Sequence, residues 1–395
     1  MANETLSKAK VAKNDEFYTQ YHDIEREVEA YLEYNPDVFR NKTVLLPCDD
    51  PEWSNFTRYF AQNFERLGLR KLISTSYAYE SKKYKGPIQL TLFETNAPQF
   101  DEGKTQTHGK IFVLTHDSNG NGRVDIEDLQ WQYLEGDGDF RSKEVTRLRD
   151  EADIIVTNPP FSLFRQFLAW IVEAEKQFLI IGNQNAITYK EVFPLIKENK
   201  LWLGKGFKGG AAHFISNYKD YATAGDHREG MIRVSGVVWF SNIEHGRRHQ
   251  PLQLMTMADN LKYSKHKEIK GKAGYDHYDN YDAIEVPYTD AIPSDYDGVM
   301  GVPISFLDKY CPEQFEILGL TSGRNEFDKI AWPSKRYINP IQVNRDRTET
   351  NGSKANTRAT ILLSQVPDDI YYKASNADGP MQIIYARILI RKKKN

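Results

Sequence analysis

The sequence is poor in cysteine and has no long apolar run, and both shortages limit the class of protein. Its two cysteines, Cys48 and Cys311, are too few for a disulfide framework or a cysteine-ligated zinc site. This usage fits a reducing compartment, and the cytoplasm is the expected location. No stretch approaches the roughly 18 consecutive apolar residues of a membrane span, and residues 1–15 lack the apolar core of a signal peptide. The sequence therefore predicts no membrane partner.

Several motifs for catalysis and cofactor binding are also missing. The chain contains no G-x-S-x-G nucleophile elbow and no P-loop, and its first predicted strand is not followed by a G-x-G-x-x-G turn. The nine histidines show no H-E-x-x-H or H-x-x-E-H spacing, so we expect no catalytic zinc. The formal charge of −3 gives no global sign of nucleic-acid binding, so a DNA surface would require local clusters of positive charge.

The composition that remains is that of a globular protein. Hydrophobic residues make up 40% and charged residues 27% of the 395 positions, which allows a full core to be buried. A chain of this length suits two domains, or one large domain with an insertion. No internal repeat is visible.

The first part of the chain predicts an α/β fold. Residues 43–46 form a short apolar run typical of a buried strand, an amphipathic helix is expected over residues 52–67, and a second strand over residues 71–74. A strand, a helix and a strand in this order indicate a parallel β-α-β unit, the beginning of a doubly wound sheet. Further strands are expected at residues 110–114, 154–156, 177–182 and 232–240.

The segment Asp153–Phe161 carries the main functional signal. Its apolar strand ends in Asn158, Pro159, Pro160 and Phe161, and an amphipathic helix follows at once. The two prolines stop the strand. They also fix the backbone just beyond its carboxyl end, where open α/β sheets bind ligands. We interpret this turn as a catalytic site, and the alternative is that the proline pair only ends a strand.

The chemistry that suits this turn is methylation of an exocyclic amine. An adenine amino group is a poor nucleophile because its lone pair is delocalised into the ring, and its two N–H groups need two acceptors. The side-chain oxygen of Asn158 and the carbonyl oxygen of Pro159 would supply them. Phe161 would stack on the face of a base rotated out of the duplex. No strong base is required, because aligning the amine with a bound methyl donor would remove most of the barrier.

The turn after the first strand is the expected place for a nucleotide-like cofactor. It carries two carboxylates and consists of Pro47, Cys48, Asp49 and Asp50. Without a glycine-rich phosphate cradle, NAD is not indicated, whereas S-adenosylmethionine carries no phosphate. Carboxylates in this turn could meet the ammonium group and ribose hydroxyls of that donor. In the alternative interpretation, the two aspartates only cap the following helix.

A second acidic turn precedes the catalytic segment. Asp139 would accept a hydrogen bond from the amino group of the donor's adenine, and Phe140 would pack on the face of that ring. The alternative is an ordinary turn followed by a helix that is capped by Ser142.

Residues 117–128 have the side-chain spacing of an EF-hand calcium loop. The last position is Asp128 where glutamate is expected, the entering segment is strand-like, and no paired second loop exists. A surface hairpin rich in Asn, Asp and Gly explains the segment better, and no metal is predicted.

The C-terminal part of the chain contains two basic stretches that include aromatic or histidine residues. The first holds Arg247 and Arg248, and the second holds Lys262 and Lys265. These side chains would contact DNA phosphates, and merely solvated loops are the alternative. The composition changes near residue 243, which we take as the start of a second region.

These segments together resemble the EcoRI-type adenine-specific DNA methyltransferases, enzymes of restriction–modification systems with solitary and phage-borne relatives. The Cys-Asp-Asp-Pro-Glu-Trp-Ser-Asn run is much more specific to this family than the Asn-Pro-Pro-Phe turn. That turn is shared with amino-methyltransferases that act on RNA or on protein glutamine. The resemblance is carried by residues 14–20, 48–56, 138–142, 157–162, 284–287 and 296–303.

The resemblance implies an α/β fold with a Rossmann-like methyltransferase core, whose doubly wound sheet is mostly parallel, and a C-terminal mixed α+β region. Residues 1–242 would form the S-adenosylmethionine-binding catalytic domain, with an insertion around residues 80–138. Residues 243–395 would recognise the DNA target. Phe17, Tyr18 and Thr19 would join the two acidic turns in contacting the donor.

The expected function is therefore site-specific N6-methylation of a flipped-out adenine in duplex DNA. The expected partner is double-stranded DNA, any cognate restriction endonuclease would act separately, and the family leads us to expect a monomer. RNA adenine or protein glutamine methylation is the first alternative, and a catalytically silent DNA-binding relative is the second. The recognition sequence does not follow from the resemblance, because it depends on the few side chains that reach base edges.

Overall fold

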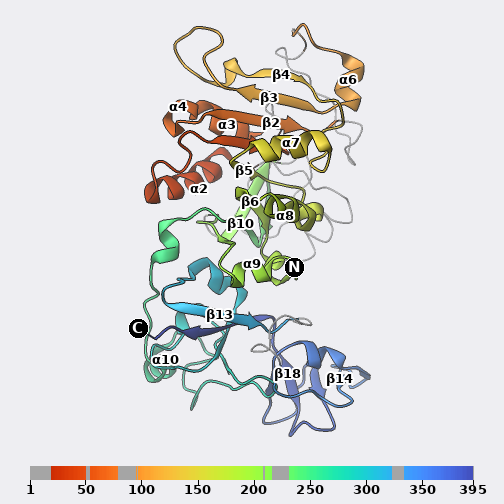
Figure 1. Ribbon diagram of the computed structural model, residues 1–395. Helices are drawn as coiled ribbons and strands as arrows, with labels where there is room; N and C mark the ends of the chain where they lie inside the picture. The colour runs from red at the N-terminus through yellow and green to blue at the C-terminus, as the bar shows by residue number, and fades with distance from the viewer. Residues whose placement is uncertain are drawn as a thin grey trace. The chain divides into compact units, whose positions relative to one another are not determined.

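The computed structural model describes residues 19–49, 54–78, 95, 97–207, 210–215, 231–322 and 333–394. Two units can be distinguished (Figure 1). The N-terminal unit lies within residues 1–186 and 201–246, and the C-terminal unit within residues 187–200 and 247–395. Among the helices of the described ranges, none is long and apolar enough to cross a membrane. The functional division at residue 243 stays a prediction.

The N-terminal unit is organised around an eight-stranded sheet with the order β4-β3-β2-β1-β5-β6-β10-β7 (Figure 1). A separate antiparallel pair is formed by β8 (Ala211–Ile215) and β9 (Met231–Ser235). The strands of the large sheet are β1 (Thr43–Leu46), β2 (Lys71–Ser76), β3 (Lys110–Leu114), β4 (Gln130–Tyr133), β5 (Ile154–Thr157), β6 (Gln177–Asn183), β7 (Trp202–Leu203) and β10 (Val237–Ser241).

The centre of the large sheet is parallel. Strand β1 pairs in parallel with β2 on one side and with β5 on the other, and β5 pairs in parallel with β6. Strands β3 and β10 run the opposite way, and the outermost strands β4 and β7 point along the centre again. The predicted α/β core with a mostly parallel sheet is confirmed. Its antiparallel pairs lie on both flanks.

Helices accompany this sheet in the N-terminal unit. They are α2 (Tyr21–Tyr34), α3 (Asn55–Gln62), α4 (Phe64–Leu67), α6 (Glu102–Thr107), α7 (Lys143–Glu151) and α8 (Phe164–Glu173). Of these, α2, α3 and α4 contribute apolar side chains to the main core of the sheet. The single helix predicted over residues 52–67 is observed as α3 and α4, which are separated at Asn63. Gly68 ends α4 with φ +63, a left-handed conformation that favours glycine.

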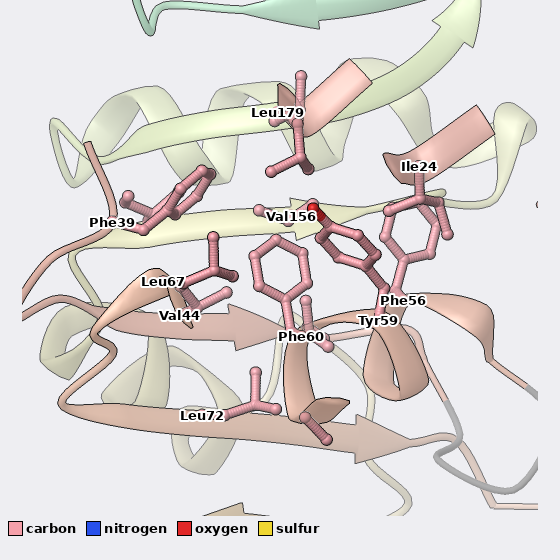
Figure 2. Packing of buried hydrophobic residues seen from close by; sticks show 14 of the residues in the cluster. Ile24, Phe39, Val44, Phe56, Tyr59, Phe60, Leu67, Leu72, Val156 and Leu179 are labelled. Atoms are coloured by element: carbon pink, nitrogen blue, oxygen red, sulfur yellow. The ribbon is translucent and has the colours of Figure 1, made fainter. Parts of the chain in front are cut away.

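The core lies between α3 and the parallel strands (Figure 2). Phe56, Tyr59 and Phe60 share one face of α3 because they are spaced three and four residues apart, and each is at most 2% exposed. They pack with Val44 of β1 and Val156 of β5. Burying an aromatic or aliphatic side chain of this size stabilises the fold by roughly 1.5–3 kcal/mol. This packing fixes the ends of β1 and β5 relative to the start of α3.

The loop at residues 117–128 connects β3 with β4. The Asp117 carboxylate accepts from the N–H groups of Gly120 and Gly122, and Asp128 accepts from those of Ser118 and Asn119. Both carboxylates thus close turns of their own loop, which supports the hairpin interpretation. The described residues include no group of three or more His, Cys, Asp or Glu side chains placed to hold a metal ion.

The C-terminal unit contains two further sheets. The four-stranded sheet has the order β11-β12-β19-β13 and the five-stranded sheet the order β15-β14-β17-β18-β16. Helices α9 (Phe193–Lys197) and α10 (Met257–Tyr263) belong to the same unit. The strands are β11 (Ile284–Glu285), β12 (Met300–Pro303), β13 (Phe315–Leu320), β14 (Ile341–Val343), β15 (Glu349–Asn351), β16 (Thr360–Leu362), β17 (Tyr371–Lys373), β18 (Met381–Ile383) and β19 (Arg387–Lys392).

Candidate functional site

The chain reverses its direction of winding between β1 and β5. From β1 it passes through α3 to β2 on one side, whereas β5 pairs with β1 on the other side and leads through α8 to β6. Open α/β sheets bind ligands at such a switch point, outside the carboxyl ends of the strands. Both predicted turns lie there, because Pro47–Asp49 follows β1 and Asn158–Phe161 follows β5.

A buried carboxylate joins these two strand ends. Asp49 is 6% exposed, and its Oδ2 accepts from the hydroxyl of Thr157 at 2.5 Å. Its Oδ1 accepts from the hydroxyl of Ser54 at 2.7 Å, and Ser54 in turn caps α3 by accepting from the N–H of Phe56. Asp49 therefore fixes the last residue of β5 and the first turn of α3 at once. The predicted capping role is indirect, through Ser54.

Thr19 lies beside the turn that is predicted to be catalytic. Its carbonyl accepts from Asn55 Nδ2 at 2.8 Å, and its hydroxyl lies 3.4 Å from Asn158 Nδ2. Asn158 is half-buried. The structure thus brings a residue predicted to contact the methyl donor next to a residue predicted to bind the substrate amine. The two predictions came from segments far apart in the sequence.

The two prolines shape the backbone after β5. Pro159 is buried, and the Pro160 carbonyl accepts from the N–H of Leu163 at 2.9 Å. This bond begins a short 3₁₀ helix at Phe161, which continues into α8. Phe161 is half-buried and packs against the main core. Packing against the main core therefore holds the turn in place.

The turn that contains Asp139 is held close to the end of β2. The N–H of Ala78 donates to the Asp137 carbonyl at 2.7 Å, and the N–H of Gly109 donates to the Gly136 carbonyl at 2.9 Å. Because β2 is parallel to β1, this turn lies at the same edge of the sheet as Asp49. All three predicted turns are therefore found along one edge.

Gly138 allows this close approach. Its φ of +81 is strained for other residues, and an added Cβ would overlap the Ser76 carbonyl oxygen. We expect Gly138→Ala to lower the free energy of unfolding by about 2–4 kcal/mol, because it combines backbone strain with overpacking.

The measurement is the change in melting temperature, with Gly136→Ala as the matched control. An added Cβ at Gly136 meets no atom within 4 Å, and the stability of this variant should stay within about 0.5 kcal/mol of the unaltered protein. Equal melting temperatures for the two variants would show that the turn moves away from β2 without cost.

Asp139 and Phe140 have partners of their own. The Arg141 guanidinium donates to both carboxylate oxygens of Asp139, at 2.9 and 2.6 Å. These bonds lower the pKa of Asp139 below its ordinary value, against the opposing effect of burial. Phe140 is 5% exposed and packs edge-on against Phe167 and Trp170. Its packing on a donor's adenine ring stays a prediction, and in this structure it is a core side chain.

A comparison with protein families gives the family to which a chain with this site geometry belongs. The profile described as "Adenine-specific methyltransferase EcoRI" matches residues 5–393. The chain belongs to this family. No solved structure matches the chain.

Three curated relatives agree with the family assignment. The type II methyltransferase M.EcoRI of Escherichia coli is 42% identical over 331 residues, which cover 82% of this chain and 92% of the relative. M.MpnI of Mycoplasma pneumoniae is 34% identical, with 79% of this chain and 84% of the relative covered. M.MgeORF184P of Mycoplasma genitalium is 33% identical, with 79% and 85% covered. Both are also named type II methyltransferases.

An adenine-specific methyltransferase needs a bound methyl donor, and two buried atoms indicate where it could bind. Nε2 of Gln20 and Oγ1 of Thr75 are buried and form no hydrogen bond within the described part of the chain. Gln20 follows Thr19, and the Thr75 carbonyl accepts from the N–H of Asp49 at 3.1 Å. Buried polar groups usually have partners, so a ligand at this edge would satisfy them.

Some predicted residues lie outside the described residues, and others were missed. Phe17, Tyr18 and Asp50 belong to the first group. Pro47 is buried and Cys48 half-buried at the end of β1, and their contacts with a donor stay predictions. The sequence reasoning did not assign roles to Gln20, Ser54, Asn55, Thr75 and Thr157. All but Thr75 lie inside segments that carry the family resemblance, which could have pointed to them.

The four basic residues predicted to bind DNA are engaged within the C-terminal unit. Arg247 pairs with Asp308 at 2.6 Å and Lys265 with Asp290 at 2.8 Å. Arg248 is 3% exposed and donates to the Asn199 side chain. The Lys262 ammonium lies 4.9 Å from the centre of the Tyr263 ring. Phosphate contact by these residues stays a prediction, and buried Arg248 supports it least.

Proposed function

We propose that the chain is a site-specific DNA adenine N6-methyltransferase that uses S-adenosylmethionine. The observation that carries this proposal is the position of the Asn158 turn beside the Asp49 turn, at the switch point of the sheet. Family membership supplies the reaction class, and the names of the type II relatives favour DNA as the substrate. In this proposal, both the substrate and the donor bind at the carboxyl edge formed by β2, β1 and β5.

In this proposal, Asn158 and Pro159 bind the target amine. The side-chain oxygen of Asn158 and the carbonyl oxygen of Pro159 accept one hydrogen bond each from the two amine N–H groups. Asn158 Nδ2 lies 3.4 Å from the Thr19 hydroxyl, and this contact of the amide NH₂ group with the protein supports the proposed role of the amide oxygen. Phe161 stacks on the flipped base. The two hydrogen bonds and the stacking thereby hold the amine with its lone pair directed at the methyl group of the donor.

The donor site is rich in hydrogen-bond acceptors. When bound, S-adenosylmethionine supplies a methyl group on a positively charged sulfur. The carboxylates of Asp49 and Asp139 suit its cationic and hydroxyl groups, and Gln20 Nε2 suits its carboxylate. In the proposed transfer, a nitrogen–carbon bond would form as the sulfur–carbon bond of the donor breaks. The amine then loses one proton to water, because neither Asn158 nor Pro159 is basic enough to keep it.

The wider setting follows from the same proposal. Residues 1–242 carry catalysis and donor binding, and residues 243–395 recognise the DNA sequence. The protein works as a monomer in the cytoplasm, and any cognate restriction endonuclease acts as a separate protein.

The test is long-read modification sequencing of DNA from a methylation-free host that expresses this chain. We expect N6-methyladenine in one short motif, and none with Asn158→Ala. Unmodified DNA from a host that contains soluble, well-expressed protein would contradict the proposal. Incubation with RNA and with protein glutamine substrates would then distinguish the alternative substrates from a silent DNA-binding protein.

A further inference from the structure

A pocket of about 340 Å³ lies in the C-terminal unit, outside the residues assigned to catalysis. The segment 261–276 forms one wall, and strands β11, β18 and β19 contribute the others. Its volume lies within the range of small-ligand sites. The function proposed above does not use this pocket.

A fixed guanidinium stands in the wall of the pocket. Arg387 donates from Nε and Nη2 to the Glu285 carboxylate, at distances of 2.6–3.2 Å. Both side chains are largely buried, with 15% and 6% exposed. The hydroxyl of Tyr278 also donates to Glu285. Nη1 of Arg387 forms no hydrogen bond within the described residues, so one face of the fork remains available in a fixed position.

Two exposed side chains in the pocket wall are able to contact a ligand. Gln382 lies on β18, and its amide has no hydrogen-bond partner in the part of the chain that the structure describes. Tyr385 is 88% exposed, the highest value among the exposed large hydrophobic residues of that part. Neither side chain is needed to fill the core. A donor–acceptor amide beside an exposed ring suits a ligand that is flat and carries both donors and acceptors.

The charges of the pocket exclude a phosphate as its occupant. Two cations, Lys272 and Arg387, are balanced against three carboxylates, those of Glu268, Asp276 and Glu285. Lys272 is paired with Asp276 at 2.6 Å. The slight excess of negative charge repels a phosphate but accepts a neutral base edge.

Positive charge is concentrated next to the pocket. The basic segment, residues 262–272, carries five lysines against one glutamate and contributes Glu268 and Lys272 to the pocket wall. Lys267 and Lys270 are exposed and form no ion pair within the described residues. A base-binding pocket bordered by lysines matches the usual division between base contacts and phosphate contacts.

We propose that this pocket binds base edges of the DNA target and so contributes to sequence recognition. This inference rests on the proposed function. Arg387, held by Glu285, donates to the major-groove acceptors of a guanine, and Gln382 binds an adenine through its amide. Tyr385 packs on a base or sugar at the rim. Lys267 and Lys270 hold the adjacent phosphates.

The test compares exposed variants that leave the fold intact. The affinities for a duplex with the methylated motif and for a scrambled duplex are measured with the full chain. Gln382→Ala and Tyr385→Ala should lower the ratio of the two affinities about ten- to a hundredfold. Gln365→Ala, an exposed glutamine in the same unit that does not line the pocket, should leave the ratio unchanged. Lys267→Ala should weaken binding to both duplexes equally and reduce its salt dependence.

The outcomes separate this inference from the proposed function. If the unaltered chain methylates one motif but Gln382→Ala and Tyr385→Ala behave like Gln365→Ala, the pocket does not read the target and the inference is wrong. If the unaltered chain methylates no DNA, the proposed function fails and the inference fails with it. A changed motif in the Gln382→Ala variant would support the inference directly.

Discussion

Asn158→Ala is expected to lower the rate of methyl transfer by a factor of at least about 10²–10³. The variant removes one of the two acceptors that bind the amine in the transition state, and loss of one such group commonly has an effect of this size. The proposed role of Asn158 is to bind the substrate amine, and its Nδ2 lies 3.4 Å from the hydroxyl of Thr19, a residue predicted to contact the donor. Donor affinity, measured by calorimetric titration with S-adenosylmethionine, should therefore change by less than about threefold, which is within 1 kcal/mol.

Asn121→Ala provides a matched control for this variant. Asn121 is exposed in the loop at residues 117–128, and among the described residues its side chain accepts only from the N–H of Arg123. Its turnover should equal that of the unaltered chain. Turnover by Asn158→Ala at the control rate would overturn the catalytic assignment. If Asn158→Ala loses both donor affinity and turnover, Asn158 belongs to the donor site instead.

Local sequence patterns were sufficient to predict the centre of the fold and the position of the turn that contains Asn158. Apolar runs without polar alternation mark β1 and β5 because both strands are buried on both faces. The proline pair marks the end of β5 because proline cannot continue the hydrogen bonding of a sheet. Such signals depend only on neighbouring residues. The positions of Asp49 and Asn158 at strand ends followed from them.

The links between these elements could not be predicted, because they depend on strand register and packing. Asp49 and Thr157 are 108 residues apart and meet only because β1 and β5 pair in parallel with one register. Phe140 looked like a ring available to a ligand, but α8 supplies Phe167 and Trp170 to cover it. Arg248 likewise looked like an exposed cation, and only tertiary structure buries it.

The same limit applies to the ion pair of Glu285 and Arg387, which are 102 residues apart. We expect Arg387→Met to lower the free energy of unfolding by about 3–5 kcal/mol, because Glu285 would remain as a buried charge without a cation. In thermal unfolding of the full chain, this loss corresponds to a drop of roughly 5 °C. An unchanged melting temperature would show that solvent reaches Glu285 and that the pair adds no stability.

The double variant Glu285→Gln/Arg387→Met separates stability from recognition. Glutamine is neutral and can still accept from the Tyr278 hydroxyl, so most of the lost stability should return. If Arg387 also reads a guanine, the double variant should fold and still show weakened discrimination between target and scrambled duplexes, by about ten- to a hundredfold. Recovery of both properties would assign the pair to structure alone. Recovery of stability without recognition is the result we expect, because methionine fills the space of the arginine stem but donates no hydrogen bond to a base.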